Sequence, residues 1–548
     1  MNRFAALLDK LSFEPSRNAK VRLLVDYFKS TPDPDRGFAL AALTGALSFR
    51  HAKPKLIKTL IAERVDPYLF DLSYDYVGDL SETVALLWPR VERSAEQESI
   101  SLATVVQSLM GASSVEQPHL LAGLLDGLDE TGRWALLKLI TGAMRIGVSA
   151  RVAKQAVAEF GDRPAHEIED LWHALSPPYL ELFAWLEGRA GKPETDNPAP
   201  FRSAMLAHAL DEADCERMPL EDFRAEWKWD GIRVQASVGQ TPEGRKIVNL
   251  FSRTGEDISS AFPDIVEALA QEPLASFAID GELLILRDGR TQPFGVLQQR
   301  LNRKLVSAKL LTDYPAHIRA YDILALDGED LRPLPFDERR RVLESFIAAA
   351  KTARLDLSPL VKAANWNELA AARRDPAAAG AGIDADAIEG IMLKRADSAY
   401  LPGRPKGFWF KWKRDPATVD AVLMYAQRGH GKRSSLYSDY TFGVWRNRGD
   451  AEALVPVGKA YFGFTDAELR ELDLYVRNHT VDRFGPVREI AHGKNAGLVL
   501  EIAFEGVNRS TRHKSGLAMR FPRISRIRWD KPAHEADRIE TLEAMLKT

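Results

Sequence analysis

The stretch EWKWDGIR, residues 226–233, places Lys228 two residues before the pair Asp230-Gly231. An alternating apolar and polar run follows at 233–238 and is typical of a strand. A Lys-x-Asp-Gly match arises by chance in about one chain in ten of this length. Taken alone, the stretch therefore indicates a surface strand that ends in an Asp-Gly turn.

Four further short motifs follow in order, and each carries groups that bind phosphate or metal. They are Ser252-Arg253 after an apolar run, Asp280-Gly281-Glu282 between two expected strands, EGIMLK at 389–394 and WFKWK at 409–413. Each motif alone is typical of an ordinary turn or a solvated charge. Together they predict one polyanion-binding cleft, lined by carboxylates at strand ends, by lysines and by an arginine.

Changes of composition along the chain predict three domains. Residues 1–200 are rich in Ala and Leu, predict an all-α domain and end in a Pro-rich linker at 191–200 that we expect to stay extended. Residues 201–416 predict an α+β domain, and residues 417–548 predict a mostly β domain of the size of a small barrel. The expected helices of the middle domain cover 261–271, 336–351 and 366–374. One helix of the first domain is expected to bury Leu136, Leu137, Ile140, Ala143 and Met144.

The overall composition narrows the class of protein. With 548 residues, 45% of them apolar, the chain is too long for one core and too apolar for disorder. A single cysteine, Cys215, excludes a disulfide framework and a Cys-based zinc site and favours a reducing, cytosolic compartment. No run reaches the roughly 18 apolar residues of a membrane span. The first residues predict an amphipathic helix and no signal peptide, so we expect a soluble protein.

The net charge of -3 argues against a uniformly basic surface, but the basic residues are clustered. Segment 394–414 carries seven Lys or Arg and one acid, Asp397, and segment 509–531 carries eight against Asp530. These two segments predict local phosphate-binding surfaces.

In this order the motifs K-x-D-G-x-R, S-R, D-G-E, E-G-x-M-x-K and K-x-K resemble the motif set of the ATP-dependent DNA ligases, within the covalent nucleotidyltransferases. The resemblance continues through RFPR at 520–523 and RWDK at 528–531, which look like the C-terminal signature of DNA ligases, and through AYDI at 320–323. Segment 140–148, ITGAMRIGV, is similar to part of the helical DNA-binding domain of the larger ligases. The resemblance implies a helical DNA-binding domain at 1–200, an adenylation (nucleotidyltransferase) domain at 201–416 and an OB-fold domain at 417–548.

The resemblance also implies a reaction. Lys228 would attack the α-phosphate of ATP to give lysyl-AMP, AMP would pass to a DNA 5′-phosphate, and a 3′-hydroxyl would then displace it and seal the nick. A lysine with its ordinary pKa of about 10.4 is protonated near neutrality. We expect the cations that accompany Lys228, together with a bound metal ion, to lower its pKa; they are Arg233, Lys394, Lys411 and Lys413.

Further roles follow from the matching motif positions. Glu226 would read the adenine amino group, Tyr321 would stack on the ring, and Arg233 and Glu282 would contact the ribose. Glu389, with Glu282, would hold Mg²⁺, which suits an all-oxygen site with few protein ligands. Arg253 is a predicted phosphate ligand, Arg404, Lys411 and Lys413 would hold the triphosphate, and Lys394 is a further cation of the predicted cofactor site. The cations expected to orient the pyrophosphate are Arg520, Arg523, Arg526, Arg528 and Lys531.

The implied partner is nicked duplex DNA, encircled by a monomer in a bacterial-type cytosol during repair, replication or recombination. An RNA ligase, a GTP-using capping enzyme and a non-catalytic nucleic-acid-binding protein remain alternatives. The chain has no His-Glu-x-x-His and no Gly-x-x-x-x-Gly-Lys-Ser/Thr motif, which excludes that type of metal hydrolase and a P-loop enzyme. Four tryptophans flank the lysine motifs and are expected to pack the sheet that carries the lysines, with stacking on nucleotide as the alternative: Trp227, Trp229, Trp409 and Trp412. The Ala- and Gly-rich stretch 371–386 is expected to be an irregular insertion.

Overall fold

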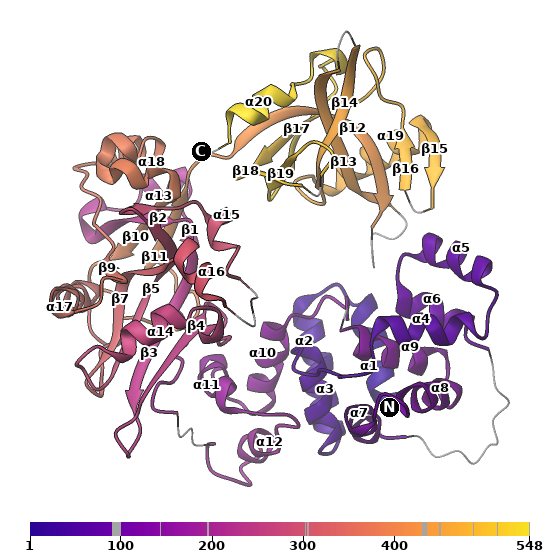
Figure 1. Cartoon of the computed structure of the whole chain (residues 1–548), viewed down its shortest axis with the longest axis horizontal. Coiled ribbons are helices and arrows are strands. Elements are labelled where there is room, and N and C mark those ends of the chain that lie inside the picture. Colours follow the sequence, from indigo (N-terminus) through magenta and orange to yellow (C-terminus); the bar gives the residue numbers. More distant parts are fainter. Residues whose placement is uncertain are drawn as a thin grey trace. The chain divides into compact units, whose positions relative to one another are not determined.

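The computed structural model describes residues 1–89, 100–142, 144–193, 197–301, 303, 306–429, 436–448, 451–485, 487–511 and 513–546. Contacts divide the chain into two compact units. The first contains Met1–Arg163, Ser176–Lys192 and Pro416–Thr548, and the second contains Pro164–Leu175 and Pro193–Asp415. Figure 1 shows a helical region, a mixed region and a mostly β region in chain order. The expected multidomain fold class is confirmed.

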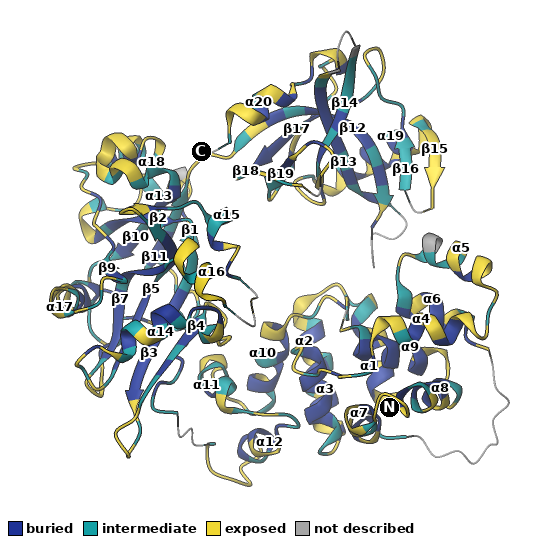
Figure 2. Ribbon diagram, in the orientation of Figure 1, coloured by how far each residue is buried: buried dark blue, intermediate teal, exposed yellow. Residues whose placement is uncertain are grey.

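The N-terminal region is helical because its apolar residues recur at helical spacing. In α1 the four residues Phe4, Leu7, Leu8 and Leu11 are buried, and Figure 2 shows helices in this region that expose one face and bury the other. The helices of this region are α1 (Asn2–Phe13), α2 (Arg17–Ser30), α3 (Asp35–Leu43), α4 (Pro54–Ala62), α5 (Pro67–Val77), α6 (Leu80–Leu87), α7 (Leu102–Gly111), α8 (Gln117–Asp126), α9 (Glu130–Thr141), α10 (Ala150–Phe160) and α12 (Leu180–Leu186).

Helix α9 ends earlier than the sequence pattern predicts. Leu136, Leu137 and Ile140 are buried as expected. Gly142 has a φ of 68°, the left-handed conformation that stops a helix. The prediction that Met144 continues the apolar face of this helix is therefore wrong, and Ala143 lies outside the described residues.

The second unit is built on two sheets, of which the larger has the order β4-β3-β5-β7-β8. Helices α14 (Pro263–Ala270) and α17 (Phe336–Ala349) bury Ile265 and Leu343 against it. Both lie within helical stretches expected from the sequence. The strands of this sheet are β3 (Ile232–Gln240), β4 (Lys246–Ser252), β5 (Phe277–Arg287), β6 (Arg290–Thr291), β7 (Ala316–Leu326), β8 (Glu329–Asp330) and β9 (Leu355–Leu357).

The end of the expected linker packs on this sheet. The Ser237 hydroxyl donates a hydrogen bond to the Pro200 carbonyl (2.9 Å), and the Asn249 amide donates to the Ala199 carbonyl (2.9 Å). Ala199 is buried. The linker is thus packed and not solvated where it meets β3, and this covering explains why β3 is buried without the alternation of a half-exposed strand. Helix α11 (Ala165–Leu171) joins the same unit, where the Asp170 carboxylate accepts a hydrogen bond from the Ser203 N–H (2.8 Å).

The smaller sheet carries the lysine motifs. Its order is β1-β11-β10-β2, with strands β1 (His208–Ala209), β2 (Phe223–Trp229), β10 (Ile388–Arg395) and β11 (Trp409–Lys413). Trp227, Trp229 and Trp409 are buried and Trp412 is partly buried, which confirms their packing role. The turn at 230–231 connects β2 to β3 of the other sheet, so it is a crossing between two sheets and not a surface hairpin. The short helices α13 (Glu212–Cys215), α15 (Phe294–Leu297), α16 (Ala308–Asp313) and α18 (Trp366–Arg374) complete the unit.

Asp280, Gly281 and Glu282 lie inside strand β5, so the prediction that they separate two strands is wrong. A glycine is needed there because a Cβ atom would meet the Ile318 side chain at 2.8 Å and the Arg319 carbonyl at 2.9 Å. The strand alternation places the two carboxylates on one face.

The stretch expected to be an irregular insertion is partly helical. Residues 371–374 complete α18, and the irregular part, 377–387, is anchored by two aspartates. The Asp384 carboxylate pairs with Arg319 (2.9 Å), and the Asp386 carboxylate pairs with Arg290 (2.8 Å). The expectation of irregular structure is therefore correct only from residue 377 onward.

The C-terminal region is a small OB-fold-like barrel. Strand β12 (Ala417–Arg428) pairs with β13 (Tyr437–Arg448) on one side and with β17 (Val499–Phe504) and β16 (Val487–Ile490) on the other. Register shifts in the β12–β13 pairing allow β12 to bend between these partners. Phe442, Leu472 and Leu500 belong to its buried core. The remaining elements are β14 (Ala451–Ala460), α19 (Asp466–His479), β15 (Thr480–Phe484), β18 (Gly506–Arg509), β19 (Leu517–Arg520), β20 (Arg523–Arg528) and α20 (Ile539–Ala544).

Over the described ranges, no helix combines the length and the apolar character that a membrane crossing requires.

The close approach at Gly281 gives a stability prediction. We expect Gly281→Ala to lower the free energy of unfolding by about 1–3 kcal/mol, because the added methyl must displace β7. Gly123→Ala in α8 is the control. A Cβ there meets no atom within 4 Å, so we expect a gain of up to about 1 kcal/mol. Urea denaturation followed by tryptophan fluorescence measures both, and a Gly281→Ala protein as stable as the wild type would contradict the prediction.

Candidate active site

Strand pairing brings Lys228 and Lys413 to the two sides of one carboxylate. Gly390 pairs with Lys228 on β2 and with Lys413 on β11. Between Ile388 and Gly390 the register shifts, so Glu389 is the extra residue of a β-bulge, a feature that redirects a side chain. The Glu389 carboxylate contacts the Lys228 ammonium through Oε1 and the Lys413 ammonium through Oε2 (3.2 Å).

Gly390 makes this arrangement possible. Its φ of 153° lies in a region that favours glycine, and a Cβ atom would lie 2.3 Å from the Trp412 carbonyl. The glycine in EGIMLK is therefore required by the close approach of β11.

The two lysines set the protonation of Glu389. Burial raises the pKa of this carboxyl, but the charges and hydrogen bonds of Lys228 and Lys413 outweigh it and hold the pKa below its ordinary value. Glu389 is thus a carboxylate at neutral pH and carries the negative charge that a metal ion needs.

Glu282 lies beside the turn at 230–231. A Cβ atom on Gly231 would lie 2.7 Å from the Glu282 Cγ, which places Glu282 against the backbone that follows Lys228. Burial raises the pKa of Glu282 to about 8; the Lys228 charge opposes this shift and the Glu389 carboxylate adds to it. In the absence of a bound cation Glu282 is therefore protonated at neutral pH.

Lys411 belongs to a cluster of cations. Burial lowers its pKa, and four further charges lower it in the same direction: Lys228, Lys413, Arg253 and Arg404. Arg253 follows β4 and Arg404 precedes β11, and both are exposed. The structure thus brings together cations from three of the sequence motifs, with Arg404 in addition, as expected for a polyanion-binding cleft.

Arg233 is engaged by partners that the sequence reasoning missed. Its guanidinium forms a bidentate ion pair with Asp280 and donates a hydrogen bond to the Tyr400 hydroxyl (3.0 Å). The Tyr400 hydroxyl donates to Asp280 (2.7 Å), and both Asp280 and Tyr400 are buried. A contact of Arg233 with a ribose stays a prediction. The D-G-E motif could have indicated the Arg233–Asp280 ion pair. In a strand, Asp280 lies on the same face as Glu282, which was already expected near Arg233.

Glu226 lies in a buried network with Lys394 and Arg340. Its carboxylate accepts from the Lys394 ammonium (2.7 Å) and from the Arg340 guanidinium (2.9 Å). The Lys394 ammonium lies 4.5 Å from the ring centre of Tyr321 and also donates to the Tyr321 carbonyl (3.0 Å). Further rings enclose it, those of Trp409 at 4.7 Å and Phe336 at 4.9 Å.

The side chain of Lys394 is 1% exposed. The structure therefore places it beneath Tyr321, in contact with Glu226, and does not bring its ammonium onto the surface where a phosphate would bind. Arg340 was not expected from the sequence, because nothing in the pattern of α17 distinguishes it from its neighbours Arg339 and Arg341.

The barrel carries the basic C-terminal segment, described here by itself. Arg528 follows the inward-facing Ile527 on β20, and Lys531 lies in the turn beyond it. Both cations contact the Asp420 carboxylate. Arg520 ends β19, and its guanidinium lies 5.9 Å from the ring of Phe521. Arg523 begins β20 and is half-buried, and Arg526 on the same strand is exposed.

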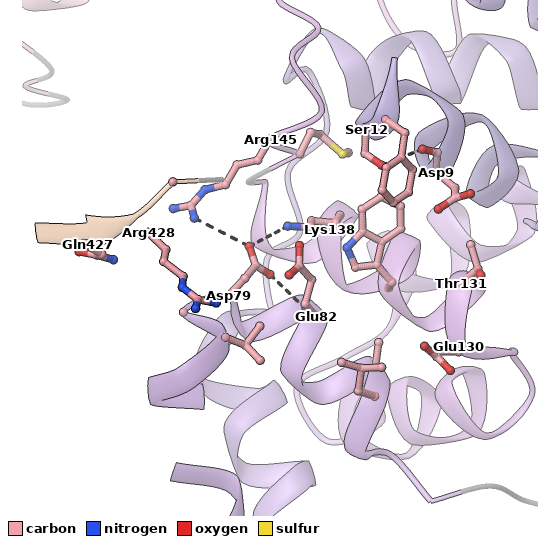
Figure 3. A pocket seen from close by; sticks show the side chains of 18 of the residues that line it. Asp9, Ser12, Asp79, Glu82, Glu130, Thr131, Lys138, Arg145, Gln427 and Arg428 are labelled. Carbon is pink, nitrogen blue, oxygen red and sulfur yellow. Dashed lines mark hydrogen bonds and ion pairs between the residues drawn. The ribbon is translucent and has the colours of Figure 1, made fainter. Parts of the chain in front are cut away.

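In the helical region the segment 140–148 presents Arg145 on the surface. Figure 3 shows Asp79 between Lys138 and Arg145. The Lys138 ammonium is buried against Asp79 (2.7 Å), whereas Arg145 is 55% exposed and 3.9 Å from the same carboxylate. A buried ion pair thus fixes the base of the segment that resembles a DNA-binding element.

No group of three or more His, Cys, Asp or Glu side chains that could hold a metal ion occurs among the residues that the structure describes. The donors near Lys228 are the carboxylates of Glu282 and Glu389, which are hard oxygen ligands. Mg²⁺ commonly binds through one or two carboxylates together with substrate phosphates and water, so these residues fit it.

Comparisons with known proteins match every region. A family model described as ATP dependent DNA ligase domain matches residues 204–413, the ATP dependent DNA ligase C terminal region matches 433–531, and the DNA ligase N terminus matches 1–158. A probable DNA ligase of Koribacter versatilis is 31% identical, over 100% of this chain and 97% of its own length. DNA ligase 1 of Korarchaeum cryptofilum is 29% identical, over 98% and 97%.

A solved structure named Pmar-Lig_Pre. is 16% identical over 96% of this chain and 99% of its own, with a TM-score of 0.58, and shares the fold. The resemblance seen in the motifs is confirmed by the full-length relative and by the three family matches. The chain belongs to the ATP-dependent DNA ligase family and is therefore an enzyme that uses ATP and binds DNA.

Proposed function

We propose that this ligase seals 5′-phosphate/3′-hydroxyl nicks in duplex DNA through lysyl-AMP and DNA-adenylate intermediates. The observation that supports it most is the placing of Lys228 beside the bulged Glu389, with Lys411 and Lys413 close by. A protein that only binds nucleic acid does not require a nucleophilic lysine next to a carboxylate that can coordinate a metal ion.

In the first step the Lys228 amine attacks the α-phosphorus of ATP. A P–N bond forms, the P–O bond to pyrophosphate breaks, and the lysine loses its proton. In the ligand-free protein Glu389 accepts a hydrogen bond from the Lys228 ammonium, which has no lone pair. If Glu389 held a metal ion, Lys228 would lose this partner and would be left among cations that favour a neutral amine.

Glu282 and Glu389 would hold the Mg²⁺ ion, which supplies neutralisation of charge on the phosphates. Arg253, Arg404 and Lys411 would hold the phosphates by the same electrostatics. Tyr321 would stack on adenine, with Lys394 beneath it as a support, and Glu226 would lie close to the adenine amino group.

In the later steps AMP passes from Lys228 to a DNA 5′-phosphate, and a 3′-hydroxyl displaces it. The family resemblance implies that the barrel turns over the active site for the first step and then presents another face to DNA. We propose that the chain acts as a monomer around nicked duplex DNA, in the bacterial cytosol, during repair, replication or recombination. The surface Arg145 would contribute a phosphate contact from the helical region.

The role of Lys228 as the nucleophile gives a prediction for lysine adenylylation. With α-labelled ATP and Mg²⁺, we expect the wild type to retain label after denaturing electrophoresis, and Lys228→Ala to retain below about 1% of it, because the nucleophile is lost. Glu389→Gln is expected to slow labelling by about a hundredfold, because it removes the charge that binds the metal.

Two variants of exposed residues in the same unit serve as controls. Lys309→Ala on α16 and Glu267→Gln on α14 should label at the wild-type rate. Full labelling of Lys228→Ala would contradict the assignment of the nucleophile, and the absence of label in the wild type would contradict the enzymatic proposal itself.

The substrate is tested by sealing of a singly nicked duplex with each of the four nucleotides. We expect sealing of nicked DNA with ATP and, with GTP, at most about 1% of that rate, since a site that hydrogen-bonds one base discriminates strongly against another. Sealing of an RNA duplex but not of DNA would overturn the substrate assignment.

The protonation of Glu282 gives a pH prediction. Its pKa is about 8 in the folded protein and near 4.5 when unfolded, so the folded state binds the extra proton between these values. Stability therefore falls as pH rises from about 4.5 to 8. From pH 6 to pH 8 we expect the stability of Glu282→Gln, which stays neutral, to rise relative to that of the wild type by about 2 kcal/mol.

Urea denaturation without metal or nucleotide, at pH 6 and pH 8, measures this difference. Glu267→Gln is again the control, because Glu267 is exposed and its substitution should give no pH-dependent difference. A constant gap between Glu282→Gln and wild type at both pH values would contradict the proposed protonation of Glu282.

A further inference from the structure

One carboxylate of the barrel, Asp420 on β12, holds two cations of the C-terminal signature. Its Oδ2 atom accepts from Arg528 Nη1 (3.1 Å) and from Lys531 Nζ (2.8 Å). The Asp420 side chain is 12% exposed, and each cation is 21% exposed. Both long side chains are thus ordered but still reach the surface.

Asp420 is itself rigidly held. Its backbone N–H donates to the Asp537 carboxylate (2.7 Å), and the Asp537 N–H donates back to the Asp420 carbonyl (2.8 Å). Within the barrel, β12 also pairs with β17 at this residue. Because the Asp420 backbone is held in this way, its carboxylate fixes the positions of the Arg528 guanidinium and the Lys531 ammonium.

Arg528 is held on a second side by Asp530. The guanidinium Nε donates to Asp530 Oδ1 (3.0 Å), and Nη2 donates to Oδ2 (2.8 Å). Asp420 engages the remaining nitrogen, Nη1, so the plane of the guanidinium is fixed from two directions. The backbone N–H of Lys531 donates a hydrogen bond to the backbone carbonyl of Arg528 (3.2 Å), which keeps the two residues within one turn.

The other oxygen of Asp420, Oδ1, is buried and has no hydrogen-bond partner within the described part of the chain. A buried unsatisfied carboxylate oxygen costs free energy. An apolar residue would avoid this cost, so the position is not explained by stability alone.

We propose that Asp420 is a positioning residue that holds Arg528 and Lys531 side by side as a preordered binding pair for the pyrophosphate of ATP. This inference rests on the proposed function, because it is the first step that releases pyrophosphate. Each cation keeps N–H groups that Asp420 does not use. Because the pair shares one Asp420 carboxylate, it retains a positive charge that attracts phosphate oxygens, while the exposed Asp530 is screened by water.

The test substitutes Asp420→Asn, which keeps the shape and removes the charge. Adenylylated protein is mixed with inorganic pyrophosphate, and the release of AMP from Lys228 as ATP is followed. We expect the half-saturating pyrophosphate concentration to rise about tenfold, because two long side chains must be ordered anew on binding. Single-turnover sealing of a nicked duplex that already carries AMP should keep the wild-type rate, because no pyrophosphate takes part.

A matched variant of the barrel distinguishes a specific effect on pyrophosphate binding from a general loss of barrel stability. Asp473 on α19 is also a largely buried barrel aspartate, paired with Arg477 and bonded to the Tyr437 N–H, but it lies outside the signature. Asp473→Asn should leave the half-saturating pyrophosphate concentration unchanged, even if it lowers the midpoint temperature of thermal unfolding. An equal response of both variants, or an equal loss in pyrophosphate binding and in sealing by Asp420→Asn, would overturn the proposal.

A double-mutant cycle with Arg528→Ala gives a second readout. If Asp420 acts through Arg528, Asp420→Asn should have a much smaller effect in the Arg528→Ala protein than in the wild type. Equal effects in both backgrounds would overturn the proposal. A wild type that forms no lysyl-AMP would instead refute the proposed function, so the two failures are distinguishable.

Discussion

The site depends on the pairing of one carboxylate with two lysines across a β-bulge. Without the extra residue at Glu389, the side chains of β10 would change face, and the carboxylate would no longer lie between Lys228 and Lys413. Gly390 permits β11 to approach closely enough for this contact. The spacing of the EGIMLK motif is therefore a consequence of strand geometry, and the chemistry follows from that geometry.

The sequence predicted the parts of the site that lie within short motifs. The structure brings Lys228, Glu389 and Lys413 together because each motif occupies one strand or turn, so its local spacing survives folding; their roles stay predictions. Other residues of the motifs, such as Glu226 and Arg528, are held by partners that lie far away in the chain. No short sequence pattern marks these partners. Arg340 binds Glu226 from 114 positions away, and Asp420 binds Arg528 from 108 positions away.

The wrong predictions also have a physical cause, because each was made from a short stretch of sequence without its tertiary contacts or backbone conformation. Asp280-Gly281-Glu282 resembles a turn because Gly next to an acid is typical of turns, yet the glycine serves a close approach of β7. The end of α9 was missed because a left-handed glycine stops a helix even where apolar residues continue at helical spacing. Domain-scale features were easier to predict, because composition averages over many residues.

The net charge of -3 is compatible with phosphate binding because the binding cations are already paired. Lys228 and Lys413 share Glu389, Arg233 pairs with Asp280, and Arg528 and Lys531 share Asp420. If these cations bind phosphate as proposed, the phosphate would replace one anionic partner with another, and the cations are already ordered by their ion pairs. On the proposed function, Glu389 would then be available to a metal ion, and the same exchange would release the Lys228 amine for attack. The ion pairs thus order these side chains, and in the proposed reaction their exchange would also set the protonation of Lys228.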